Sequence, residues 1–138
     1  MLEFVDTNIL VYAYDRASPA KHERAKSLVQ SLWRSDKGCV SIQVLQEFYV
    51  TTVRKIAQPL QPDYAAQIVA DLAQWKLFAP GGQDVIEAIQ LHRRYTISFW
   101  DAMVIHSALR LGCSVVWSED LNTGQIYENV RVRNPFLV

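Results

Sequence analysis

The chain has 138 residues, of which half are apolar and a fifth are charged, a globular composition that excludes a disordered or fibrous chain. Its length predicts a single domain over residues 1–138. Lys and Arg number 14 and Asp and Glu number 14, and this net charge of zero argues against a polycation that coats nucleic acid through charge alone.

Short apolar runs alternate with segments of helical periodicity along the chain. In chain order we expect a strand over residues 2–5, helices over about 8–14 and from 18 onward, a strand over 38–40, helices from 41 to about 57 and from 62 onward, a strand over 77–79, helices over about 83–95 and 98–111, and strands over 114–118 and 131–133. This alternation predicts an α/β fold, a three-layer α/β/α sandwich with a short central parallel sheet.

The cysteines, the histidines and the hydropathy pattern indicate a cytoplasmic protein. Cys39 and Cys113 lie in separate apolar runs without a CxxC pair, so we expect two buried free thiols. No two of the three histidines have zinc-type spacing. The first residues include no basic region, and no apolar run approaches about 18 residues, so we expect neither export nor membrane insertion.

Asp6 and Asp120 follow predicted strands, at the edge of a parallel sheet where ligands bind. Asp6 directly follows the strand over 2–5, and Asp120 comes two residues after the strand over 114–118. Asp6 could equally cap the helix that begins near Asn8, and Asp120 could equally be a turn residue before Gly124. Taken singly, each residue is explained as well by local structure as by a ligand site.

Asp101 lies on the apolar side of the helix predicted over 98–111. At about 100° per residue, Ser107 and Arg110 form the polar face of this helix. Asp101 projects to the opposite side, where burying a carboxylate without a partner costs several kcal/mol. Ser98 and Asp101 also have the spacing of a capping box. The residues alone leave a ligand role and a capping role open, and the two are compatible.

Glu47 shows no sign of burial in the sequence pattern. It projects about 160° from the centre of the apolar stripe on the helix predicted from residue 41 to about 57. Periodicity therefore predicts a glutamate on a solvated surface.

Four acidic segments carry a family resemblance. They are Phe4-Val5-Asp6-Thr7-Asn8, Gln46-Glu47-Phe48, Ser98-Phe99-Trp100-Asp101-Ala102 and Trp117-Ser118-Glu119-Asp120-Leu121. In this order and spacing, together with the tail through Asn134-Pro135-Phe136, they resemble the PIN-domain nucleases over the whole chain, and the VapC-type toxins of toxin–antitoxin pairs in particular. No single segment is specific, but the four together are a strong signal.

The resemblance implies a PIN-like fold and a metal-dependent ribonuclease. By it, Asp6, Glu47, Asp101 and Asp120 form the catalytic acidic pocket and hold the metal, supported by Asn8 and Ser118, while Glu119 leaves the identity of the fourth acid open. Four clustered carboxylates repel one another, and an all-oxygen site suits Mg²⁺ or Mn²⁺. The resemblance further implies an RNA substrate cleaved to a 5′-phosphate and a 3′-hydroxyl, a cognate antitoxin and a homodimer.

Two other classes of function compete with a ribonuclease. A phosphoaspartate phosphatase needs a second Asp two residues after the first, where this chain has Asn8, and a receiver domain needs an acidic pair and a late Lys that are absent. A non-catalytic PIN-like module for partner binding is the third possibility, although the complete set of four acids argues against it. We expect His106 to be a packing residue and not a catalyst. Trp100 and Trp117 flank the proposed site in the sequence and could stack a base, but core packing is the favoured interpretation for both.

Gathering four acids in one site changes the meaning of the zero net charge. Ten acids then remain against 14 bases elsewhere, an excess of four positive charges that is enough for a modest RNA-binding track.

Overall fold

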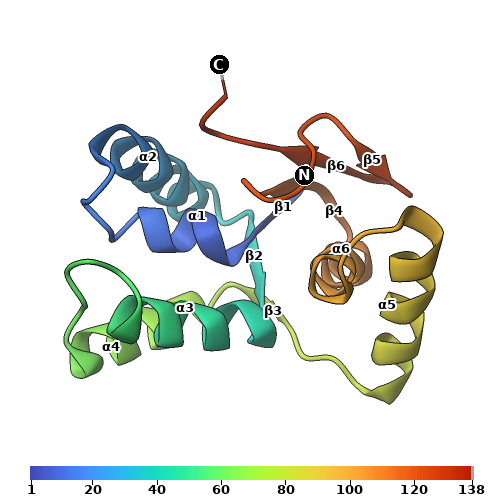
Figure 1. The fold of residues 1–138 in the computed structure, drawn as a ribbon, viewed down its shortest axis with the longest axis horizontal. Helices are drawn as coiled ribbons and strands as arrows, with labels where there is room; N and C mark the ends of the chain where they lie inside the picture. Colours follow the sequence, from blue (N-terminus) through green and yellow to red (C-terminus); the bar gives the residue numbers. More distant parts are fainter. Residues whose placement is uncertain (138) are drawn as a thin grey trace.

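The computed structural model describes residues 1–137 and contains a central sheet of six strands flanked by helices (Figure 1). The strands are β1 (Leu2–Val5), β2 (Gly38–Ser41), β3 (Lys76–Phe78), β4 (Cys113–Trp117), β5 (Ile126–Tyr127) and β6 (Val130–Arg133). Their order across the sheet is β3-β2-β1-β4-β6-β5, and every neighbouring pair is parallel except β5 and β6. The expected α/β sandwich around a mainly parallel sheet is confirmed.

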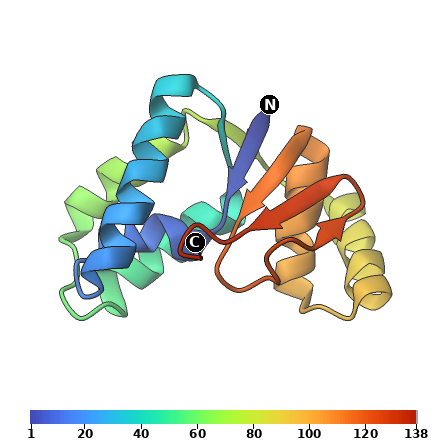
Figure 2. The ribbon, with the colours of Figure 1, turned by 90° about the horizontal axis from the view of Figure 1, so that it is seen from above.

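Six helices connect the strands. They are α1 (Thr7–Tyr12), α2 (Pro19–Ser35), α3 (Ile42–Arg54), α4 (Pro62–Leu72), α5 (Gly82–Tyr95) and α6 (Phe99–Leu111). From β1 the chain steps outward through β2 to β3 and then returns across the sheet to β4. Because such crossovers are right-handed, α1 to α4 cover one face and α5 and α6 cover the other, as Figures 1 and 2 show.

The antiparallel strand pair at one edge of the sheet was not fully predicted. Strand β6 confirms the strand predicted over 131–133, but β5 was not predicted. Two residues are too few to show an alternating pattern, and the turn between the strands contains Glu128 with φ of 54° instead of a glycine. Other element bounds differ from the predicted ones by one to a few residues, as helix and strand ends commonly do.

Helix α6 lies between the sheet and α5, and this position corrects one expectation. Residues Ala102 to Ala108 are all buried, including Ser107, which was predicted to lie on a polar face. The Ser107 hydroxyl satisfies its hydrogen-bonding capacity within the helix by donating to the Met103 carbonyl oxygen at 2.7 Å. Arg110 does reach solvent with part of its side chain.

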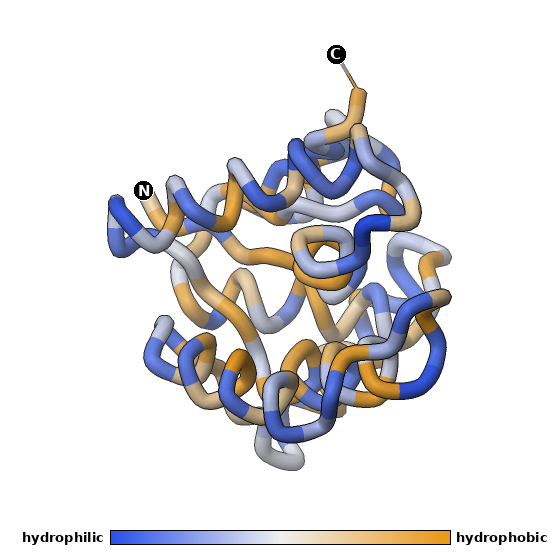
Figure 3. Tube along the Cα trace, turned by 90° about the vertical axis from the view of Figure 1, so that its left-hand side faces the viewer, coloured by the Kyte–Doolittle hydropathy of each residue, from blue (hydrophilic) through white to orange (hydrophobic). Residues whose placement is uncertain are grey.

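The core lies on both faces of the central strands. Phe4 and Val5 of β1 and Val116 of β4 are fully buried, and Figure 3 shows hydropathy alternating along the surrounding helices. Cys39 and Cys113 are buried and free, as expected. Among residues 1–137, no helix is long and apolar enough to cross a membrane.

Candidate active site

The order in which the chain adds strands to the sheet reverses between β1 and β4, and polar side chains gather at that point. The two strands are parallel neighbours, although the chain leaves β1 toward one edge and reaches β4 from the other. Ligand sites in open α/β sheets form at the carboxyl ends of strands where the order reverses. Asp6 follows β1 there, and Ser118 and Asp120 follow β4.

Asp6 is held by hydrogen bonds to both carboxylate oxygens. It is only 6% exposed, and it is the N-cap of α1, so its capping role is confirmed. The Thr7 backbone N–H donates to Oδ1 at 2.8 Å, and the Ser118 hydroxyl donates to Oδ2 at 2.8 Å. The Asp120 backbone N–H in turn donates to Ser118 Oγ at 3.2 Å. This chain of donors fixes the direction of the Asp6 carboxylate.

Burial raises the pKa of Asp6 from 3.8 to about 7, against the opposing effect of the hydrogen bonds from Ser118 and Thr7. The negative charges of Asp120 and Glu47 raise it further. The pKa of Asp101 is also raised, again by burial first and then by the same two charges. These carboxylates therefore interact with one another electrostatically.

Glu47 reaches this group from α3. Its side chain is exposed, as periodicity predicted, and its Oε1 accepts a hydrogen bond from Thr7 Oγ1 at 2.7 Å. Periodicity predicted that Glu47 is exposed, and the family resemblance implied that it lies in the acidic pocket. The two agree, because the hollow between α1, α3 and α6 is open to water.

Asp101 enters from the first turn of α6. Ser98 is the N-cap of this helix, and its Oγ accepts the Asp101 backbone N–H at 3.0 Å. The cap uses the backbone N–H of Asp101, and its carboxylate lines the same hollow as Asp6, where hydrogen bonding with the Ser98 side chain partly offsets the rise in its pKa. Asp101 therefore takes part in the helix cap and lies in the hollow at the same time.

All four predicted acids line one cleft of about 660 Å³, which we call the acidic cleft. Its lining residues are Asp6, Thr7, Asn8, Val11, Tyr12, Asp15, Gln43, Gln46, Glu47, Val50, Thr51, Lys55, Trp100, Asp101, Val104 and Asp120. Ser118 lies behind this lining and contacts Asp6.

The structure separates the two candidates for the fourth acid. Asp120 lines the acidic cleft, whereas Glu119 is bound to Lys21, with Glu119 Oε1 and Lys21 Nζ 2.9 Å apart. Asn8 contacts the same segment through its side chain. Its Oδ1 accepts a hydrogen bond from the Glu119 backbone N–H at 3.3 Å, whereas its Nδ2 is buried without a hydrogen-bond partner.

A divalent cation suits the chemistry of the acidic cleft. Five carboxylates line it against one cation, Lys55, and two unit charges about 4 Å apart repel by roughly 4 kcal/mol at an effective dielectric constant near 20. The donors are all oxygen atoms, which Mg²⁺ and Mn²⁺ prefer. Among the described residues, no three of these carboxylates bring oxygen atoms within 4.8 Å of one another.

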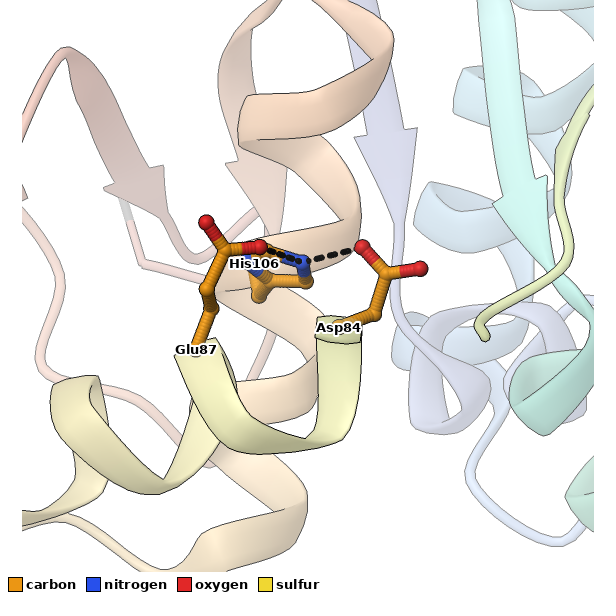
Figure 4. A group of neighbouring side chains, drawn as sticks. All are labelled: Asp84, Glu87 and His106. Atoms are coloured by element: carbon orange, nitrogen blue, oxygen red, sulfur yellow. Dashed lines mark hydrogen bonds and ion pairs between the residues drawn. The ribbon is translucent and has the colours of Figure 1, made fainter. Parts of the chain in front are cut away.

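A second polar cluster lies outside the cleft, between α5 and α6, and no sequence pattern predicted it. Asp84, Glu87 and His106 each bring one ligand atom to within 4.8 Å of the others, a spacing that could hold a metal ion (Figure 4). However, Asp84 Oδ1 lies 2.8 Å from His106 Nε2 and already accepts from Arg110 Nη1 at 2.7 Å, and Asp84 Oδ2 accepts the Gly81 backbone N–H. We interpret this cluster as a link between α5 and α6, and His106 is buried within it, as expected of a packing residue.

The two tryptophans that flank the site in the sequence differ from each other. Trp117 is half-buried, as expected, donates from Nε1 to Glu3 and packs against the Arg133 guanidinium. The expectation that Trp100 packs in the core is wrong, because its side chain is 62% exposed and lines the acidic cleft. It lies at the start of α6, outside the buried part of that helix.

The chain is similar to known proteins in its family and in its fold. The family model described as PIN domain matches residues 4–129. Mycobacterium tuberculosis VapC20, described as a sarcin-ricin loop cleaving toxin, has a TM-score of 0.64 at 21% identity and covers 86% of this chain and 89% of its own. A search of curated proteins finds no match.

Two further solved structures also share the fold. FitAB bound to an IR36 DNA fragment has a TM-score of 0.72 at 19% identity and covers 99% of this chain and 97% of its own. A toxin–antitoxin complex from Klebsiella pneumoniae has a TM-score of 0.67 at 18% identity and covers 99% of both chains. At these identities the structural similarity is evidence for the fold alone.

Proposed function

This chain belongs to the PIN-domain family, and from that premise we propose that it is a Mg²⁺- or Mn²⁺-dependent ribonuclease and the toxin of a toxin–antitoxin pair. One observation carries the proposal. Four acids from four separate segments line a single cleft at the point where the strand order reverses: Asp6, Glu47, Asp101 and Asp120. A surface role for each acid would not require this convergence.

The proposed reaction is hydrolysis of an RNA phosphodiester. The oxygen of water bonds to phosphorus as the bond to the 3′-oxygen breaks, and the 3′-oxygen takes up a proton, which leaves a 5′-phosphate and a 3′-hydroxyl. A divalent cation, when bound, would supply activation of the water and neutralisation of charge at the phosphate.

The chain itself supplies a rigid set of oxygen ligands. Asp6 and Asp101 would hold the ion most directly, with Glu47 and Asp120 completing the site directly or through water. Ser118 and the Thr7 backbone orient Asp6 through its two oxygens, and the Thr7 hydroxyl orients Glu47. Such positioning matters because ligands with fixed orientations lose little freedom when the ion and substrate bind.

Cleavage of RNA by purified protein tests the proposal. We expect cleavage with Mg²⁺ or Mn²⁺ and none with EDTA, and we expect Asp6→Asn and Asp101→Asn to abolish it while circular dichroism shows a retained fold. Asp15→Asn is the matched control, because Asp15 lines the same cleft, is not one of the four proposed ligands, and binds the Ala17 backbone N–H.

Two further variants test the fourth acid. Asp120→Asn should abolish cleavage, whereas Glu119→Gln should retain most of it, because Glu119 faces Lys21 and not the cleft. A pure protein that binds its partner but cuts no RNA with either ion would support the non-catalytic PIN-like module, and cleavage of a simple phosphate ester alone would support a different phosphate-hydrolysing enzyme.

The proposed partners are a cognate antitoxin and a second copy of this chain. The support is that the structural neighbours include a toxin–antitoxin complex from Klebsiella pneumoniae and a toxin, VapC20. We expect expression of the chain to arrest growth and co-expression of the product of an adjacent short gene to restore it. Light scattering on the purified chain should give the mass of a dimer.

A further inference from the structure

We infer that Trp100 is a stacking platform for one unpaired nucleobase of the RNA substrate, next to the phosphate that is cut. This inference rests on the proposed ribonuclease function and adds a residue that positions the substrate. It starts from the position of one exposed indole beside the acidic cleft.

Trp100 is exposed at the acidic cleft, where its indole can contact a bound ligand. Apart from the N-terminal methionine, it is the most exposed large apolar side chain of the described residues, at 62%. It directly precedes Asp101, and both residues line the acidic cleft. A ligand that reaches the Asp101 carboxylate therefore passes close to the indole.

The indole has a defined orientation without being covered. Its ring centroid lies 5.0 Å from that of Phe99, with the two planes at 77°, which is the edge-to-face arrangement that aromatic rings favour. This contact restricts the indole while most of its surface stays in water. A restricted aromatic surface loses little conformational freedom when a flat ligand stacks on it.

The charges of the acidic cleft explain why an uncharged contact is needed there. RNA is a polyanion, and the cleft has five carboxylates against the single ammonium of Lys55. Even with a divalent cation bound, the lining does not attract phosphates in the way a basic groove does. Stacking of a base on an aromatic ring does not depend on charge and contributes affinity for any base.

The remaining apolar surface of the cleft also suits a base. Val50 of α3 is the other large apolar side chain that is both exposed and in the lining. The volume of about 660 Å³ lies in the usual range for pockets that enclose small molecules, about 300–1,000 Å³. A nucleotide could therefore place its phosphate at the carboxylates and its base against the apolar part.

The base must be unpaired to use this surface. In a duplex each base is covered on both faces by its neighbours, so an indole reaches a base face only where the RNA is single-stranded, bulged or looped. Trp100 would therefore contact an unpaired or looped nucleotide and not a base within a duplex.

The test couples Trp100 to one base. The rate kcat/KM is measured in Mg²⁺ for wild type and Trp100→Ala on a short unstructured RNA and on copies in which one nucleotide at a time lacks its base. We expect Trp100→Ala to lower kcat/KM about 5- to 100-fold, mainly through KM. At one position, removal of the base should lower kcat/KM much more for the wild-type protein than for the Trp100→Ala protein.

Conservative and control variants separate stacking from folding and from simple hydrophobic contact. Trp100→Phe should keep most of the affinity and Trp100→Leu should lose it, because leucine has apolar surface but no aromatic face. Ile86→Ala is the matched control: Ile86 is 51% exposed on α5, outside the cleft, and its loss should not change KM. Pairing the RNA with a complementary strand should remove the difference between wild type and Trp100→Ala.

Two outcomes distinguish failure of this inference from failure of the proposed function. If wild type cuts RNA and Trp100→Ala cuts it with the same KM, with equal abasic effects at every position, the stacking role is wrong while the ribonuclease stands, and the exposed indole then belongs to a protein contact. If wild type cuts no RNA with Mg²⁺ or Mn²⁺, the ribonuclease function itself fails, and this inference fails with it.

Discussion

Asp6→Asn should stabilise the metal-free protein at alkaline pH, although it removes the proposed key ligand. Burial raises the pKa of Asp6 from 3.8 to about 7, so the folded protein binds this proton more tightly than the unfolded chain does. Stability conferred by the protonated carboxyl is therefore present at low pH and is lost as pH rises from about 4 toward 7. Asparagine is neutral at every pH and does not incur this loss.

The size of the effect follows from the pKa. A tenfold change in an ionisation equilibrium corresponds to about 1.4 kcal/mol, so the rise from 3.8 to about 7 corresponds to about 4 kcal/mol above pH 7. The new amide must donate to Ser118 Oγ where the carboxylate accepted from it, and we allow about 1 kcal/mol for that rearrangement. We therefore expect a net gain of about 3 kcal/mol at pH 8.

The pH dependence is the decisive measurement. Urea denaturation in EDTA at pH 5 and pH 8 should show the stability difference between Asp6→Asn and wild type growing by about 3 kcal/mol over this interval, which is roughly 10 °C in Tm for a chain of this size. Asp15→Asn removes a charge from the same cleft without changing Asp6 and should show a smaller growth. Equal destabilisation by Asp6→Asn at both pH values would refute the reasoning and leave Asp6 a helix cap.

Three other variants test other parts of the structure. Asp101→Asn should melt no lower than wild type in EDTA at pH 8, because burial raises the pKa of Asp101; a large loss of Tm would mean that its position in the helix cap outweighs repulsion in the cleft. Asp84→Ala should lower the urea midpoint by leaving buried His106 without its partner, yet Mn²⁺ affinity measured by electron paramagnetic resonance should not change; a loss of Mn²⁺ binding would place the ion at Asp84 instead. Gly38→Ala should cost about 1–3 kcal/mol in urea denaturation, because a Cβ there would lie 2.7 Å from Trp75 ring carbons; unchanged stability would mean that the indole moves freely.

Much of the site could be predicted because it follows from the order of the chain. The rule that ligands gather at the carboxyl ends of parallel strands puts Asp6 and Asp120 on one edge, and the structure places both there. Asp101 was conspicuous as a charge among apolar residues. Each signal was ambiguous alone because a capping acid and a ligand acid occupy the same place at a helix start, and in this protein Asp6 is both an N-cap and a residue of the cleft.

Glu47 shows why the rest could not be derived from periodicity. A cleft filled with water exposes its residues, so the hydrophobic pattern treats a cleft glutamate and a surface glutamate alike. The order of motifs placed Glu47 in the site, and no reasoning from its helix alone could do so. Trp100 was misjudged for a related reason: aromatic residues are buried on average, and the exposure of this one depends on where α6 leaves the core.

The zero net charge conceals a strongly uneven distribution, and this has a consequence for how metal and RNA bind. The acidic cleft contains five of the 14 acids and one of the 14 bases, so nine acids and 13 bases remain elsewhere. An excess of four negative charges in the cleft thus faces an excess of four positive charges on the rest of the molecule. A polyanion such as the proposed RNA substrate would be attracted to the rest of the molecule and repelled from the cleft, and a bound divalent cation would reduce this repulsion by neutralising part of the negative charge. Binding of the ion and binding of RNA should therefore be thermodynamically coupled, each increasing the affinity for the other by the same factor.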